Sequence, residues 1–204
     1  MRSDLSRLAL ALYVLLAGLA LVLGFVRGDP DVYHHPDPVL SLPFWGEALA
    51  GVLLGAGVGQ GVVWLTQRSV LIWRWGPSVR LHRGLRQILG AADAPLRERD
   101  VLVLALSSAV AEEMLFRGWL LPAVGLAASS VLFGLVHYAP KRRDMLAWIP
   151  MAVVMGILLG SLFLLLGGLA APMTAHFFIN YRNLHFINSY DPSLRGGADE
   201  GPGS

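Results

Sequence analysis

Cysteine is absent from this 204-residue chain, and charged side chains are scarce. Without a thiol, the chain forms no disulfide and has neither a cysteine nucleophile nor a thiolate ligand for a metal. Asp, Glu, Lys and Arg together make up 15% of the residues, whereas an ordinary soluble domain carries about 25%. The formal net charge is only +2, which argues against a nucleic-acid partner.

Apolar residues dominate instead: 55% of the chain is hydrophobic, and the mean hydropathy is +0.58. The apolar runs predict an all-α, polytopic transmembrane helix bundle of about six spans, because a helix satisfies its own backbone groups in lipid. The expected spans are residues 8–26, 47–65, 100–121, 123–138, 146–166 and 169–186. We expect residues 1–190 to form a single integral-membrane domain and residues 191–204, rich in Gly, Pro and Asp, to be a disordered tail.

Three features outside the later spans refine this prediction. The first apolar run exceeds the hydrophobic region of a signal peptide, about 7–15 residues, so we expect a membrane span there. The Pro- and Asp-rich loop 27–44 contains His34 and His35, and we expect it to be a solvated loop rather than a metal site. Residues 79–89 combine apolar side chains with arginines at helical spacing, which predicts a short amphipathic helix on an anionic membrane surface.

Basic residues indicate how the chain is oriented. They gather at the amino terminus, in the segment 68–99, around Lys141 and after the last span. Because cytoplasmic loops carry an excess of Lys and Arg, we expect both termini in the cytoplasm and the chain in the inner (plasma) membrane. Lys141 is the only lysine, and every other basic residue of the Lys and Arg set is arginine. This preference for arginine, with abundant Ala, Gly and Leu, is typical of a GC-rich bacterial genome.

Two adjacent carboxylates, Glu112 and Glu113, lie with Arg117 inside the apolar run 101–121. Each ionisable group at the centre of a span costs roughly 3 kcal/mol, so such groups usually face the protein interior and serve a function. Glu113 and Arg117 are four residues apart and share a helix face, which predicts an ion pair. A purely structural pair explains those two residues equally well. Glu112 points about 100° away, toward a different neighbour, and needs another explanation.

Polar residues in the later spans recur at the same helical spacing. Phe133 and His137 are four residues apart, and so are His176 and Asn180, so each pair occupies one face of its helix. A single histidine in an apolar helix is more often a packing residue than a catalyst. Buried polar groups need partners, however, and these residues and the two glutamates are one another's natural partners. We therefore expect them to share a polar cavity.

These three motifs, Glu112-Glu113-x-x-x-Arg117, Phe133-x-x-x-His137 and His176-x-x-x-Asn180, resemble those of the CPBP intramembrane endopeptidases. That family (CAAX protease and bacteriocin-processing, or Abi) includes the type II CAAX prenyl endopeptidases. The resemblance implies a family core at about residues 100–187 and a membrane-anchored protein or peptide as substrate.

The resemblance also implies roles for the individual residues. Glu112 and His137 would activate water, and His176 and Asn180 would bind the oxyanion. Glu113, Arg117 and Phe133 would support the site, with Arg117 pairing with Glu113. The chemistry of these residue types agrees, because a desolvated glutamate is suited to acid–base work and N–H donors stabilise an oxyanion.

Two alternatives stay open from the sequence. Glu112, Glu113, His137 and His176 are also residue types that bind zinc, which would make the chain a zinc-dependent protease. We favour a mechanism without a cofactor because the His-Glu-x-x-His pattern is absent. Outside proteolysis, intramembrane Glu and His suit a small proton-coupled carrier, or the chain is an immunity or scaffold protein with no turnover.

Overall fold

The computed structural model describes residues 2–90, 95–139, 142 and 145–192, and the described residues form helices and no strand. The elements are α1 (Arg2–Arg27), α2 (Phe44–Leu71), α3 (Gly76–Ile88), α4 (Glu98–Glu113), η1 (Met114–Leu120), α5 (Leu121–Leu135), α6 (Trp148–Leu166) and α7 (Ala170–Ser189). The predicted all-α class is confirmed. Most of the tail predicted to be disordered, residues 193–204, lies outside the described residues.

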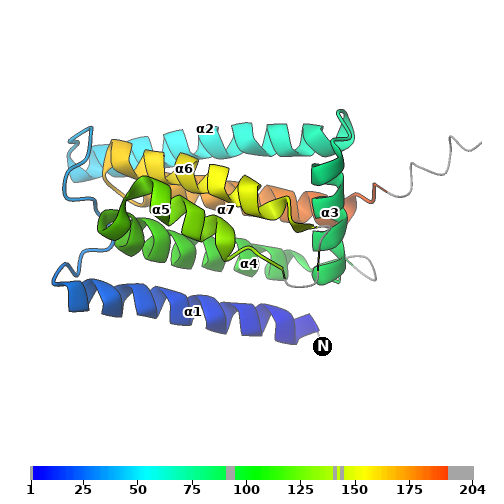
Figure 1. Ribbon diagram of the computed structural model, residues 1–204, viewed down its shortest axis with the longest axis horizontal. Helices are drawn as coiled ribbons and strands as arrows, with labels where there is room; N and C mark the ends of the chain where they lie inside the picture. The colour runs from blue at the N-terminus through cyan, green and yellow to red at the C-terminus, as the bar shows by residue number, and fades with distance from the viewer. Residues whose placement is uncertain (1, 91–94, 140–141, 143–144, 193–204) are drawn as a thin grey trace, which may run out of the picture.

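The long helices run side by side along one axis, and α3 crosses one end of the bundle (Figure 1). α4 leads away from the α3 end, and α5 returns toward it. The reversal occurs at Gly125, whose φ of 82° lies in the region that suits glycine. The amino-terminal end of α1 and the carboxyl-terminal end of α7 both lie at the end of the bundle that α3 crosses (Figure 1).

Among the described residues, four helices are long and apolar enough to cross a membrane: Ser6–Arg27, Phe44–Leu71, Glu98–Leu135 and Trp148–Leu166. The sequence predicted about six spans, and the difference has two causes. The third candidate contains α4, η1 and α5, and the chain reverses within it at Gly125, where α5 departs from helical geometry. α7 has enough residues for a span, but its polar side chains, His176 and Asn180 among them, lower its hydropathy.

Glycines on α2 allow it to pack closely against α7. A Cβ atom at Gly55 would overlap the carbonyl oxygen of Ala171, and one at Gly59 would come within 2.9 Å of the carbonyl oxygen of Ala175. Small residues at such positions let two helix backbones approach each other in lipid. The close approach holds α7, with its polar side chains, inside the bundle.

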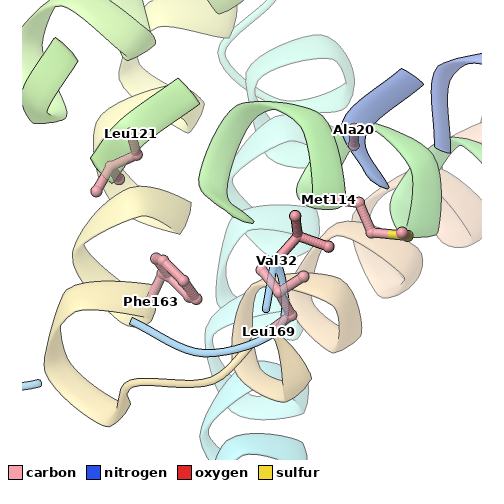
Figure 2. Packing of buried hydrophobic residues seen from close by; sticks show 6 residues of the cluster. All are labelled: Ala20, Val32, Met114, Leu121, Phe163 and Leu169. Carbon is pink, nitrogen blue, oxygen red and sulfur yellow. The ribbon is translucent and has the colours of Figure 1, made fainter. Parts of the chain in front are cut away.

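The loop between α1 and α2 contributes to the core. Most of it is exposed, as expected for a solvated loop, but Val32 is fully buried with Ala20, Met114 and Phe163 (Figure 2). The carbonyl oxygen of Val32 occupies the place that a side chain at Gly118 would take. The loop therefore anchors η1 from the end of the bundle opposite α3.

The predicted amphipathic helix 79–89 corresponds to α3, which buries Leu81 and His82 against the bundle. Arg86 donates from Nη1 to the carbonyl oxygen of Ile187 at 2.7 Å, and so satisfies a carbonyl at the end of α7. His82 contacts the carbonyl oxygen of Tyr190 at 2.9 Å. α3 thus fastens the carboxyl-terminal end of α7, the helix that carries His176 and Asn180.

Candidate active site

The predicted pair of Glu113 and Arg117 lies at the centre of the site. Nη1 of Arg117 donates to Oε1 of Glu113 at 3.0 Å, and the side chains of Arg117 and Glu113 are 2% and 0% exposed. The guanidinium lies over the ring of Phe133, 4.4 Å from its centroid, which is a cation–π contact. A buried charge without a partner is very costly, so this pairing is what allows either group inside the bundle.

The helix that carries the pair changes its winding directly after Glu113. Met114–Leu120 forms a π-helical turn, η1, in which Arg117 lies. π-Helical turns are rare and occur often at functional sites. Nothing in the residue pattern predicted this turn, because the apolar spacing of the segment fits an ordinary helix equally well.

His176 on α7 connects the two glutamates. Its Nδ1 lies 2.6 Å from Oε1 of Glu113, and its Nε2 lies 3.9 Å from Oε2 of Glu112. Because a carboxylate only accepts hydrogen bonds, Nδ1 carries the proton that faces Glu113. The ring therefore presents Nε2 toward Glu112. The sequence predicted different neighbours for the two adjacent carboxylates, but both lie beside the His176 ring, one at each of its nitrogens.

His137 lies just beyond the end of α5. Its Nδ1 donates to the carbonyl oxygen of Phe133 at 2.7 Å, and its ring stacks edge-on against Phe133 and Trp148. Phe133 in turn contacts the ring of His176, with centroids 6.3 Å apart. Because a carbonyl oxygen only accepts, the neutral imidazole of His137 has its free lone pair on Nε2.

Asn180 is held by a serine that the sequence reasoning missed. Nδ2 of Asn180 donates to Oγ of Ser108 at 2.9 Å, and Ser108 donates to the carbonyl oxygen of Ala105 at 3.2 Å. One hydrogen of the Asn180 amide stays available for another acceptor. The signal in the sequence is that Ser108 precedes Glu112 by four residues and so shares its helix face.

A cavity of about 680 Å³ brings the predicted residues together. His137, His176, Asn180 and Phe133 line it, and Ser108 does so too. Glu112 does not line the cavity but is reached through His176, and it is 13% exposed. Among the described residues no hydrogen bond or ion pair joins Glu112 to His137, although the resemblance implies that they work together.

The same residues do not fit a zinc site. Among the described residues, no three His, Asp or Glu side chains are grouped so that they could hold a metal ion. Oε1 of Glu113 is already engaged by Arg117 and by His176, and the guanidinium would repel a cation at that position. We therefore derive no step that uses zinc.

Comparison with known proteins adds independent information about this part of the chain. Residues 99–182 match the family model described as "Type II CAAX prenyl endopeptidase Rce1-like". The chain is also 40% identical over 116 residues to the "Uncharacterized protein YpbD" of Bacillus subtilis (strain 168), an alignment that covers 55% of this chain and 57% of the relative. The chain thus spans somewhat over half the length of that relative. No solved structure matches.

The matched segment begins one residue before Asp100 and ends two residues after Asn180, so it contains all three motifs. Its residues supply α4, η1, α5 and most of α7, the elements that carry the two glutamates, the two histidines and the asparagine. Over residues 99–182 the chain therefore matches the Rce1-like family of type II CAAX prenyl endopeptidases, and the relationship predicted from its motifs is confirmed.

Proposed function

We propose that the protein is an intramembrane endopeptidase that hydrolyses a peptide bond of a membrane-associated protein. The observation that carries this proposal is the buried chain from Arg117 through Glu113 to His176, which turns the His176 ring toward Glu112 beside a cavity. Packing alone does not require a second carboxylate beside that chain. A catalytic site does, because hydrolysis needs a base.

In the proposed mechanism, Glu112 is the general base. It takes a proton from water as the water oxygen attacks the carbonyl carbon of the substrate. The Nε2 lone pair of His137 accepts the other hydrogen of that water and orients it. When the carbon–nitrogen bond breaks, Glu112 delivers its proton to the amide nitrogen and becomes a carboxylate again. No other reactant is needed.

Asn180 and His176 stabilise the tetrahedral oxyanion in this mechanism. Asn180 donates the amide hydrogen that Ser108 does not accept, and His176 donates from Nε2 when that nitrogen is protonated. Donors that are fixed before the reaction cost no reorganisation in the transition state. Ser108 fixes Asn180 by accepting the other hydrogen of the same Nδ2, and Glu113 fixes His176 through Nδ1, on the opposite side of the ring from Nε2.

We further propose that the reaction needs no metal. The engagement of Glu113 by Arg117 and His176 supports this. A strong chelator is expected to leave proteolysis unchanged in purified protein whose metal content has been measured. Loss of activity on chelation, restored by added zinc, would contradict the metal-free mechanism but not the protease assignment.

The substrate is expected to be anchored in the same membrane, and both termini are expected in the cytoplasm of a bacterial cell. The arginine distribution supports this orientation, and so does the position of the amino-terminal end of α1 and the carboxyl-terminal end of α7, which both lie beside α3. Because the chain has no cysteine, single cysteines introduced by mutation report the orientation of the chain directly. Under the proposal, Ser41→Cys reacts with an impermeant maleimide from outside the inner membrane, and Arg80→Cys reacts only from inside.

Proteolysis itself is tested by reconstituting the protein in liposomes with detergent-extracted bacterial inner-membrane proteins. New amino termini are then identified by mass spectrometry. The wild type is expected to create new termini that Glu112→Gln does not, because loss of a general base lowers the rate by about 10²–10⁴. His137→Ala is expected to reduce the same cleavages.

The matched control is Glu98→Gln, which changes the same residue type at the exposed beginning of the same helix. It is expected to cleave as the wild type does. Identical termini from wild type and Glu112→Gln would refute the protease assignment.

A further inference from the structure

The Glu112 carboxylate needs a hydrogen-bond donor that the three motifs do not supply. Its Oε2 is buried and accepts no hydrogen bond among the described residues, and Nε2 of His176 is 3.9 Å away. A carboxylate in a low-dielectric site is poorly oriented unless donors hold it. A base in that condition is a weak catalyst, because its geometry is not fixed.

Tyr13 on α1 is the side chain that faces this carboxylate. Tyr13 lines the same cavity as His137 and His176, and both the charge of Glu112 and a side-chain hydrogen bond with it act on the Tyr13 phenol. Within α1, Tyr13 is half-buried, while neighbours such as Leu12 and Val14 are exposed on the lipid-facing side. The tyrosine is therefore turned inward at this position of the helix.

α1 is fixed against η1, the segment directly after the two glutamates, by residues that follow Tyr13 in the chain. Ala20, two turns after Tyr13 on the same face, is buried against Met114 (Figure 2). At the end of the helix, Nη1 of Arg27 donates to the carbonyl oxygen of Trp119 at 2.7 Å. These contacts set the height of α1 along α4 and η1, and with it the height of the Tyr13 hydroxyl.

We propose that Tyr13 is a positioning residue of the active site, whose hydroxyl donates to Glu112 and holds the carboxylate toward His176 and the cavity. The proposal rests on the proposed function only for its kinetic consequence. It extends the site to α1, which lies outside the segment 99–182 that matches the family. The first span is then part of the catalytic unit and not merely an anchor.

The kinetic test compares Tyr13→Phe, Tyr13→Ala and the control Tyr33→Phe. The substrate is a peptide with an apolar anchor that spans a bond cleaved in the reconstituted assay. Tyr13→Phe keeps the ring that lines the cavity and removes only the hydroxyl, so kcat is expected to fall about ten- to a hundredfold with KM within about twofold. Tyr13→Ala is expected to lower kcat at least as much.

Tyr33→Phe also removes one phenol hydroxyl, but from a loop residue whose hydroxyl faces the sulfur of Met114 at 4.0 Å, so it is expected to behave as the wild type. A role in packing or substrate binding gives a different result. In that case Tyr13→Phe is as active as the wild type, and only Tyr13→Ala raises KM. An unchanged kcat of Tyr13→Phe would therefore overturn the proposal, whether or not Tyr13→Ala raises KM.

An infrared measurement tests the contact without any turnover. The difference spectrum between wild type and Tyr13→Phe is expected to contain a shifted carboxylate band. The same difference recorded in a Glu112→Gln background is expected to lack it. A band that persists in that background would show that the hydroxyl acts elsewhere. Because this measurement needs no cleavage, it separates failure of the Tyr13 proposal from failure of the protease assignment.

Discussion

Nδ1 of His176 lies 2.6 Å from Oε1 of Glu113, so a carboxylate on α4 fixes the orientation of an imidazole on α7. The same oxygen accepts from Arg117 at 3.0 Å. The three groups form a buried chain in which each charge has an opposite partner. The end of that chain, Nε2 of His176, is directed toward Glu112, which makes Glu113 a structural support for its neighbour's chemistry.

Loss of Arg117 is expected to destabilise the fold strongly. Arg117→Met leaves the carboxyl group of Glu113 fully buried and without its cation, which should lower the free energy of unfolding by about 3–5 kcal/mol. The measurement is denaturant unfolding in detergent micelles. The double variant Glu113→Leu/Arg117→Met is the control, because it leaves no buried charge. It should lose less stability than Arg117→Met alone, and a larger loss would contradict this account of the pair.

Ser108 is expected to matter for catalysis and little for stability. Without its hydroxyl, the Asn180 amide loses the acceptor that orients it, so Ser108→Ala should lower kcat about tenfold with little change in KM. Ser107→Ala is the matched control, since the Ser107 hydroxyl donates to the carbonyl oxygen of Val103 on its own helix. Both variants are measured with the same anchored peptide. Equal activity of the two would show that Ser108 does not position Asn180.

Local spacing predicted the parts of the site that lie within one helix. Glu113 bonds to Arg117, Phe133 to His137, and the pair His176 and Asn180 lines one cavity, each at a separation of four residues. A helix brings such residues to one face whatever surrounds it. The type of each long element could be predicted for the same reason, since apolar runs of span length are helical in lipid.

Contacts between helices could not be predicted in this way. Tyr13 meets Glu112 across nearly half of the chain, and Val32 reaches the core from a loop that its Pro and Asp content marks as solvated. The π-helical turn after Glu113 also left no mark in the apolar pattern. Each depends on how the helices pack, which a single sequence specifies only through side-chain complementarity.

The glycines of α2 that face α7 (Gly51, Gly55 and Gly59) and those with open space beside them (Gly57 and Gly61) are expected to respond differently to alanine. A Cβ at Gly55 would overlap the carbonyl oxygen of Ala171, whereas one at Gly57 would have nothing within 4 Å. Gly55→Ala should therefore destabilise the protein by about 1–3 kcal/mol through overpacking. Gly57→Ala should be neutral or slightly stabilising, because alanine favours the helix by about 1 kcal/mol. Thermal unfolding in micelles measures both, and equal effects would contradict the close packing of α2 on α7.

His82 is expected to make stability depend on pH. Burial lowers the pKa of His82 below its ordinary value of 6.5, an effect that its bond to the Tyr190 carbonyl only partly opposes. The unfolded chain then binds a proton at a pH where the folded chain does not. Stability from this residue is complete above about pH 6.5 and is lost as the pH falls toward the folded-state pKa.

The comparison that isolates this effect is wild type against His82→Gln, unfolded in micelles at several pH values between 8 and 5. The five other histidines contribute equally to both proteins, so the difference between the two curves belongs to residue 82. Wild type should lose more stability than His82→Gln on acidification, because only its imidazole must stay neutral against Tyr190 and Phe186. Parallel curves would mean that α3 does not hold the end of α7 through a buried neutral histidine.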